Sequence, residues 1–580
     1  MTGSGKSSSL PNAFPISRRR FLLAGAGGLA CLADPGGSDG RNSRPGRLLF
    51  NCDGSMIHCW GRAALPQNSG PLSRREFTDL VFTPIGNSGV DTLLFSFGSG
   101  NVAEYQSNVL EWPGQADRFR FPESRTWHGG IEVDPRDQYL NPKSLADSGH
   151  NPPRIIVEEC RRRGMRAFVS LRMNDIHDGQ HPRGTLPNPE LPTFKRLNPD
   201  WLVPDLDWWS ALNFEVAPVR ELKLRVVEEF FDRWDFDGIE LDWLRHTFYF
   251  PRGLEREKGK YLTEFMRTVR RSLRQKAARR GRPIEIAVRV PERVEWCLEG
   301  GFEVPTWIRE GLVDSLILGQ GLTECRGLSG FRELMGSRRI PIYPSLYPFG
   351  NGYPIYPDEV IRGSAANLWR DGADGLYTFN WFFYGNWRSR LLREIAEPDL
   401  LRNKDKRYTL VQRFEAHHTG RSPRSDSVRF NTMIKAAPLP FTLDRAGAVQ
   451  TVTLPIADEV SSTLNPPRRA ELLVGLDGIA GDVLEFSLNG RVLEPQELDP
   501  VKDLAQVTRH LDIPTGHGIL GFPPRRRLDM DFSGLRLPVP VARLTPGLNQ
   551  LSLRLKRRRP DADRPVRVRR IELSVGNGEE

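Results

Sequence analysis

The stretch FDGIELDWLRH, residues 236–246, places two carboxylates two residues apart in an otherwise apolar run. Side chains two residues apart on a β-strand point to the same face, so Glu240 and Asp242 share one face of the strand. The alternating apolar residues Ile239, Leu241 and Trp243 share the other face. In a barrel the apolar face meets the surrounding helices, which leaves both acids in the lumen. Asp242 then lies at the C-terminal end of its strand, where barrel enzymes place their chemistry, and Glu240 one layer deeper.

Buried carboxylates are costly unless they are paired or hydrogen-bonded, so partners must exist. The ends of the neighbouring predicted strands offer Arg172, Asn174, Arg289 and Gln320. A carboxylate beside another carboxylate or beside an arginine has its pKa displaced, which is the condition for separate acid and base roles. We expect Asp242 to be functional. For Glu240 we prefer a place in an internal network that fills the lumen, and we keep it as a further candidate among the catalytic carboxylates.

The elements that would position these acids repeat along the chain. Short β-branched or aromatic runs alternate with amphipathic stretches; they are 48–53, 92–97, 167–174, 238–243, 284–291, 315–320, 342–347 and 375–381. Eight such units favour a closed (β/α)8 barrel over an open doubly wound sheet. We place this domain at residues 47–400.

The periodicity changes after the barrel. Residues 405–580 alternate in short runs punctuated by glycine and proline, which is typical of a β-sandwich or jelly roll. The fold class is therefore α/β, a TIM barrel followed by an all-β domain. Carbohydrate binding and simple packing are both open for the second domain.

Two known families resemble the quoted stretch. FDGIELDW is similar to the fourth-strand signature of chitinase-like family 18 glycosidases, but Leu244 stands where their catalytic glutamate would be. The chain more closely resembles the bacterial glycosyl-hydrolase-like family 10 group, which carries DGI-x-x-D at this strand and a stretch like Asn198-Pro199-Asp200-Trp201. The resemblance covers roughly residues 45–400 and implies a carbohydrate-active barrel, with only the Asp242 position carried over.

Glycoside hydrolysis normally needs a second carboxylate. Glu292 follows the fifth predicted strand and Glu324 the sixth; each alone is more simply a surface loop acid, and Asp53 and Asp175 are further candidates at the same rim. We predict Asp242 as nucleophile or base, with Glu292 ahead of Glu324 as the acid.

Sugar rings present apolar CH patches ringed by hydroxyl groups, so flat aromatic faces beside polar side chains suit them. We predict substrate contacts at the strand ends from Arg172, Asn174, His177, Arg289, Gln320, Tyr347, Asn380 and Trp381. The insertion 98–150 is long for a compact barrel, which suggests a binding role or a lid.

Other chemistries lack their motifs. His177, His181 and His246 follow the third and fourth strands, but no HxH or HExxH spacing is present, so we expect no metal and no cofactor. No GxSxG or phosphate-binding glycine loop occurs. The alternative from another functional class is a non-catalytic carbohydrate-binding surface or periplasmic protein. This alternative stays open because Leu244 stands where chitinase-like enzymes have their catalytic glutamate.

The N-terminus resembles a twin-arginine export signal. Ser17 to Leu22 reads SRRRFL before a short apolar stretch, so we predict a signal peptide at 1–33, a linker at 34–46 and a periplasmic or extracellular location. Lipidation at Cys31 is the less favoured alternative. Cys52 and Cys59 could pair after export or remain buried thiols.

Charge argues against a nucleic-acid partner. The formal net charge is 82 − 72 = +10, and the leader contributes Lys6 and three arginines, which leaves +6. An anionic polysaccharide stays open as a partner, and no later run is long and apolar enough to span a membrane. The prediction is an exported glycoside hydrolase acting on an oligo- or polysaccharide, with sugar, stereochemistry and oligomeric state left open.

Overall fold

The computed structural model describes residues 47–61, 71–120, 126–128, 131–134, 136–179, 188–206, 208–319, 328–348, 355–410, 437–459, 467, 469–479, 481–493, 505–513, 518–519 and 527–576. The predicted signal peptide and linker, and with them Cys31, lie outside the described residues. The same holds for Gln320 and Glu324, so their predicted roles remain predictions.

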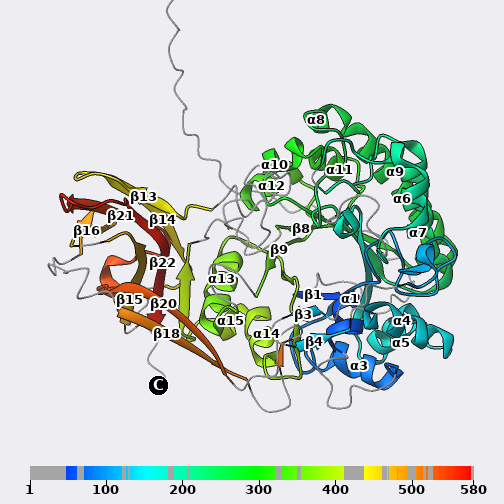
Figure 1. The fold of residues 1–580 in the computed structure, drawn as a ribbon, viewed down its shortest axis with the longest axis horizontal. Helices are drawn as coiled ribbons and strands as arrows, with labels where there is room; N and C mark the ends of the chain where they lie inside the picture. Colours follow the sequence, from blue (N-terminus) through cyan, green and yellow to red (C-terminus); the bar gives the residue numbers. More distant parts are fainter. Residues whose placement is uncertain are drawn as a thin grey trace, which may run out of the picture. The chain divides into compact units, whose positions relative to one another are not determined.

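Eight parallel strands close into a barrel, which confirms the predicted fold class (Figure 1). They follow one another around the barrel in sequence order: β1 (Leu48–Asp53), β2 (Thr92–Ser96), β5 (Arg166–Arg172), β6 (Gly238–Asp242), β7 (Glu285–Val290), β8 (Ser315–Leu318), β9 (Ile342–Leu346) and β10 (Leu376–Thr378). Each predicted run contains one of these strands or overlaps it. The structure ends most of them one to three residues earlier, because the last residues turn into the rim loops.

Helices form an outer ring around these strands (Figure 1). The helices of four or more residues are α3 (Arg74–Phe82), α4 (Asp137–Asp147), α5 (Pro152–Arg162), α6 (Thr193–Leu197), α7 (Ala217–Arg233), α8 (Glu255–Lys258), α9 (Lys260–Arg280), α10 (Val294–Glu299), α11 (Val304–Arg309), α12 (Leu328–Met335), α13 (Asp358–Arg370), α14 (Ser389–Ala396) and α15 (Pro398–Leu401). In α7, Pro218 stands in the first turn, where a missing N–H costs nothing, and the stripe of Val219, Val226 and Phe230 is buried against the barrel.

Four aspartates repeat one hydrogen bond at the N-terminal end of the barrel. Asp91, Asp237, Asp314 and Asp374 precede every second strand, and each accepts from the first backbone N–H groups of the preceding strand in the barrel. The Asp314 carboxylate, for example, accepts from Ile286 N at 2.7 Å and pairs with Arg270 at 2.8 Å. We call these four residues the collar of aspartates; in the stretches 234–239 and 369–376, a collar aspartate lies between the end of a helix and the start of the next strand.

The strands of the barrel alternate as predicted. Ile239, Leu241 and Trp243 are fully buried in the large core between strands and helices, while Glu240 faces the lumen. The base of the lumen is filled by an apolar plug that comprises Leu49, Leu94, Phe168, Ala287, Ile317, Tyr343, Tyr377 and Phe379. The lumen is therefore a packed core, with the Arg166–Glu285 pair at its N-terminal end and the charged residues described below toward its C-terminal mouth.

The insertion after β2 has more structure than a loop. It contains the short helices η2 (Gln115–Asp117) and α4, and the hairpin of β3 (Thr126–His128) and β4 (Ile131–Val133). The prediction of a long loop is corrected here, because hydrogen-bonded elements occupy much of the insertion.

The C-terminal domain consists of antiparallel sheets with their own apolar core. One sheet has the order β12-β22-β15-β20-β18, with β13 paired to β22, and the other β14-β21-β16-β17. The strands are β12 (Lys406–Thr409), β13 (Phe441–Leu443), β14 (Val449–Ile456), β15 (Arg469–Asp477), β16 (Val483–Leu488), β17 (Arg491–Val492), β18 (Ala505–Asp512), β20 (Arg527–Pro538), β21 (Gly547–Arg557) and β22 (Val566–Gly576). The exposed positions described on β14 and β21 carry no aromatic side chain, so glycan binding by this domain stays a prediction.

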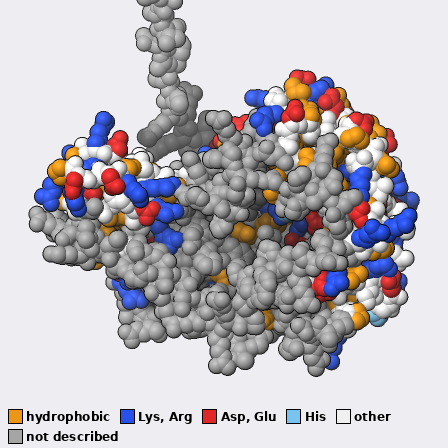
Figure 2. Space-filling model, in the orientation of Figure 1, with side chains coloured by type: hydrophobic (Ala, Val, Ile, Leu, Met, Phe, Trp, Pro, Cys, Tyr) orange, Lys and Arg blue, Asp and Glu red, His pale blue; other side chains and the backbone are white. Residues whose placement is uncertain are grey.

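Charge is mixed over the surface. On the face in Figure 2, basic and acidic side chains are interspersed over the barrel helices and do not form a patch of one sign. Among the described helices, none is both long enough and apolar enough to cross a bilayer.

Candidate active site at the C-terminal mouth of the barrel

Three charged residues form what we call the lumen layer: Glu240, Asp242 and Arg289. The Asp242 Oδ2 atom accepts from Arg289 Nη1 at 2.9 Å, and Oδ1 accepts from the backbone N–H of Leu244 at 3.0 Å. The side chains of Asp242 and Arg289 are 2% and 0% exposed. The guanidinium also lies 3.7 Å from the ring centre of Phe379. The predicted partnership between the ends of β6 and β7 is therefore present, and it is almost completely shielded from water.

Glu240 has partners other than those predicted. Its Oε2 accepts from Asn51 Nδ2 at 3.0 Å and its Oε1 from the Tyr377 hydroxyl at 2.8 Å. These two partners come from across the lumen, on β1 and β10, and Ser170 on the adjacent strand β5 is a further hydrogen-bond partner. Burial raises the pKa of Glu240 to about 7; Asp242 adds to the rise and Arg289 opposes it. Glu240 thus belongs to an internal network, in keeping with the interpretation we preferred for it.

Arg289 retains one free donor. Its Nε donates to the Gly319 carbonyl at 3.2 Å and its Nη1 to Asp242, but Nη2 is buried with no hydrogen-bond partner among the described residues. A buried unpaired donor costs about 1–3 kcal/mol. This donor next to Asp242 is therefore a place where a substrate oxygen could bind.

A second group of charges, the rim network, lies where β1 and β5 end. It comprises Asp53, Arg172, Asp175, His177 and Arg245. Arg172 pairs with Asp53, and its Nη1 donates to Asp175 Oδ2 at 3.1 Å. Arg172 also stands opposite Asp242 in the register of β5 and β6, so it connects the rim network to the lumen layer.

The hydrogen bonds of His177 assign one tautomer. Its Nδ1 lies 2.5 Å from Asp175 Oδ1, and Arg245 Nη2 lies 2.9 Å from its Nε2. Because a guanidinium can only donate, Nε2 carries the lone pair and Nδ1 the proton. The His177 side chain is 30% exposed, whereas that of Asp175 is 1% exposed. His177 is therefore the member of this pair that faces solvent.

Charge balance in the rim network keeps Asp175 ionised. Burial alone would raise the pKa of Asp175, but His177 and Arg172 outweigh it and hold the pKa well below its ordinary value. Burial, and then Arg245, lower the pKa of the neighbouring His246 well below its ordinary value, and its Nδ1 accepts from the Ile176 N–H at 3.3 Å. His246 is thus neutral in this setting.

Metal binding is another role to consider for the residues in and beside the rim network. The ligand atoms of Asp175, His177 and His246 lie within 4.8 Å of one another, and two histidines with one carboxylate suit a divalent metal. Arg172 and Arg245, however, already contact Asp175 or lie 3.9 Å from it. A divalent cation would meet these guanidinium groups, so the donor set does not fit a metal well.

A pair of acids, Glu104 and Glu190, lies beside the rim network and was missed by the sequence analysis. Gln138 Nε2 lies 3.3 Å from Glu104 and 3.2 Å from Glu190, and Ser55 donates to Glu104 at 2.7 Å. Burial raises the pKa of Glu104 to about 8, opposed by Ser55 and reinforced by Asp53. Its Oε2 is buried and has no hydrogen-bond partner among the described residues. The length of the insertion was the only sequence signal that could have drawn attention to Glu104.

The side-chain amide of Asn174 joins two loops. It is fully buried, with Nδ2 donating to the carbonyls of Leu212 and Phe248 and Oδ1 accepting from Leu212 N at 2.9 Å. Its predicted contact with substrate stays a prediction. Glu292 is buried in the turn between β7 and α10, and its pairing with Asp242 stays a prediction.

The predicted aromatic contacts lie at the ends of β9 and β10. Burial raises the pKa of the Tyr347 hydroxyl, and a hydrogen bond from Asn380 opposes the rise. Asn380 adopts a left-handed backbone conformation, with φ of 52°, which is unusual outside glycine but tolerated by asparagine. It turns the chain so that Trp381 packs beside β1, where it is 4% exposed.

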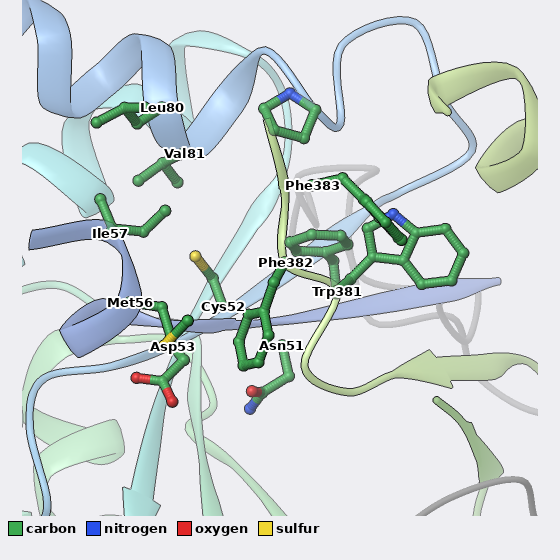
Figure 3. A pocket seen from close by; sticks show the side chains of 12 residues that line it. Asn51, Cys52, Asp53, Met56, Ile57, Leu80, Val81, Trp381, Phe382 and Phe383 are labelled. Carbon is green, nitrogen blue, oxygen red and sulfur yellow. The ribbon is translucent and has the colours of Figure 1, made fainter. Parts of the chain in front are cut away.

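Trp381 lines a narrow pocket beside β1, with room for about one water molecule (Figure 3). In Figure 3, Asn51 and Asp53 point to the same side of β1 and Cys52 to the other, as the alternation of a strand requires. The pocket is too small for a sugar ring. Cys52 and Cys59, which could have formed a disulfide, are both buried free thiols.

Comparisons with known proteins give distant structural likenesses. No family model matches the chain, and no curated protein matches its sequence. Similar solved structures include the PgaB (BpsB) glycoside hydrolase domain from Bordetella bronchiseptica, at 12% identity and a TM-score of 0.37, covering 61% of this chain and 99% of that one. The endo-β-1,4-mannanase from Thermotoga petrophila gives 10% identity and a TM-score of 0.42, covering 85% and 98%. Likeness at this level does not bear on activity, and the resemblances to families 10 and 18 remain resemblances.

Proposed function

We propose that this chain is an exported glycoside hydrolase that cleaves glycosidic bonds of an oligo- or polysaccharide at the C-terminal mouth of its barrel. Asp242 is the nucleophile in this proposal. The observation that carries the proposal is the pair of Asp242 and Arg289, because it places a carboxylate and an unused buried N–H donor side by side at the end of a barrel strand. A nucleophilic carboxylate needs a fixed position and a nearby donor for the sugar oxygens, and the pair supplies both.

Export belongs to the same proposal. The SRRRFL stretch supports the twin-arginine route, which leads to the periplasm or beyond. A fusion of residues 1–46 to a reporter, compared with the same fusion in which Arg18 and Arg19 are lysines, tests it. Export that is lost in the lysine variant supports the proposal, and export that is unchanged contradicts it.

A non-catalytic carbohydrate-binding protein is the second candidate. It is favoured by the burial of Asp242, whose side chain is 2% exposed. A binding site would not need an ionised group at that depth, so we place this candidate second.

The test is hydrolysis of a panel of polysaccharides and of aryl glycosides of glucose, galactose, mannose, fucose and N-acetylglucosamine by the full chain. Glycan binding to the same panel is measured in parallel. Asp242→Asn is compared with Asp314→Asn, the same change at the opposite end of the barrel. We expect release of sugar by the wild type and by Asp314→Asn, and none by Asp242→Asn. Binding without release by any form would replace the proposal with the binding-protein candidate.

A further inference from the structure

We propose that His177, oriented by Asp175, is the acid/base residue that serves the Asp242 nucleophile. This inference rests on the proposed function and goes further, because it assigns the second catalytic role to a histidine instead of a second carboxylate. Glu240 is sealed in the lumen and does not reach solvent, while the predicted roles of Glu292 and Glu324 as the acid stay predictions with which this inference competes.

An acid/base residue must be held in one orientation and must exchange protons with solvent. Asp175 meets the first requirement, since its Oδ1 lies 2.5 Å from His177 Nδ1 and 3.0 Å from the His177 backbone N. The 30% exposure of the His177 side chain meets the second. Among the charged side chains of the rim network and the lumen layer it is the most exposed, the next being Arg245 at 19%.

Asp175 is itself held by a loop that packs against it. Asn101 Nδ2 donates to the Asp175 carbonyl at 2.7 Å, and buried Lys223 donates to Asn101 at 3.2 Å and to the Gly100 carbonyl at 2.6 Å. Gly100 has a φ of 74°, and a side chain there would collide with the Arg172 carbonyl. The loop after β2 is therefore fitted closely to the end of β5, as a positioning residue for a catalytic group requires.

An aromatic face lies beside the histidine. The Trp208 ring is half-buried, and its centre lies 6.2 Å from that of His177 and 5.6 Å from that of His246. Aromatic faces pack against the apolar CH patches of sugars, so Trp208 would hold a sugar ring beside His177 Nε2. In the chain without substrate, Arg245 occupies Nε2, and it must move aside when a substrate binds.

The proposed reaction has two halves. Before the first, Arg245 leaves His177 Nε2 and this nitrogen takes a proton from solvent. In the first, the Asp242 carboxylate bonds to the anomeric carbon while the glycosidic C–O bond breaks, and the leaving oxygen takes that proton from Nε2. In the second, neutral His177 takes a proton from water through Nε2 as the water oxygen bonds to the anomeric carbon and the bond to Asp242 breaks. The sum is one glycosidic bond and one water converted into two hydroxyl groups, with His177 protonated again. The anomeric configuration is retained.

The test uses leaving groups of different quality. A dinitrophenolate needs no proton to depart, whereas the alcohol of a natural glycan does. With the sugar that the panel identifies, we expect His177→Ala to lose about 100-fold or more in kcat on the glycan, and less than tenfold in the first half-reaction on the dinitrophenyl glycoside, measured as the burst of dinitrophenolate. Added imidazole should restore part of the activity that His177→Ala loses. His177→Gln, which cannot transfer a proton, should be as inactive on the glycan as His177→Ala. The matched control is His150→Ala, a half-buried histidine at the end of α4.

The outcomes separate this inference from the proposed function. Equal losses on both substrates, with no rescue by imidazole, would overturn the acid/base role and leave Asp242 unaffected. Full activity of His177→Ala on the glycan would do the same. A wild type that cleaves nothing in the panel would overturn the proposed function, and the catalytic role of His177 with it. The far-UV circular dichroism and the Tm of each variant show whether a loss comes from unfolding.

Discussion

The lumen layer and the rim network are built from the same parts but differ in their access to water. Each contains an aspartate paired with an arginine, Asp242 with Arg289 and Asp175 with Arg172, at about 3 Å. In the lumen layer both partners are sealed, whereas the rim network ends in His177, which reaches solvent. A nucleophile needs a fixed charge and exchanges no proton with water, while an acid/base group must exchange one in each cycle. The two regions therefore suit the two roles.

The largest expected effect comes from removing charge in the lumen layer. Asp242→Asn keeps the shape of the side chain but leaves no nucleophile, so we expect kcat to fall by at least about 1,000-fold. The measurement is steady-state hydrolysis of the substrate found in the panel. A fall of less than tenfold would mean that the lumen layer is structural and would remove the contrast between the two regions.

Arg289→Met tests the difference between the lumen layer and the rim network through the free energy of unfolding. Breaking a buried ion pair from one side leaves an unpaired buried charge, which costs about 3–5 kcal/mol. In the rim network, Arg245→Met should cost less than this, because Arg245 lies 3.9 Å from Asp175 and Asp175 keeps Arg172 as a closer partner at 3.1 Å. Urea unfolding of both variants gives the comparison, and equal costs would contradict it.

Glu104 offers a prediction that depends on pH. In the unfolded chain this carboxyl releases its proton near its ordinary pKa of 4.5, whereas burial in the folded chain keeps the proton on until about pH 8. The wild type should therefore lose stability as pH rises between these values. Glu104→Gln, which is always neutral, should be more stable than the wild type at pH 9 by on the order of 3 kcal/mol, and nearly equal to it at pH 4. Thermal unfolding at the two pH values checks this; a difference that is the same at both would contradict it.

The smallest effect is expected at the other end of the barrel. Asp314→Ala removes the bonds to Ile286 N and Arg270 and should cost about 1–2 kcal/mol of stability without changing kcat. The collar of aspartates lies at the end that barrels use for stability. A change in kcat with unchanged stability would show that the two ends are not separate in function.

Much of this arrangement could be predicted from the sequence. A period of two residues placed Glu240 and Asp242 in the lumen, and strand order alone brought Arg289 beside Asp242. The partners of Glu240 could not be predicted, because contacts across a lumen depend on how the closed barrel staggers its strands. Glu104 was not predicted for another reason. Its position depends on the packing of an insertion, where no periodicity in the sequence indicates which side chains face the site. The hydrogen bonds of Asn174 to two loops could not be predicted either, because they depend on how those loops fold over the end of β5.

The most direct test of the account is to trap the covalent intermediate. A 2-deoxy-2-fluoro glycoside of the sugar found in the panel, carrying a dinitrophenyl leaving group, is incubated with the full chain, and the labelled peptide is sequenced by mass spectrometry. We predict one sugar per chain, attached to Asp242, in the wild type and in His177→Ala. A sugar on another residue, or a product of inverted configuration with no labelled peptide, would contradict the account.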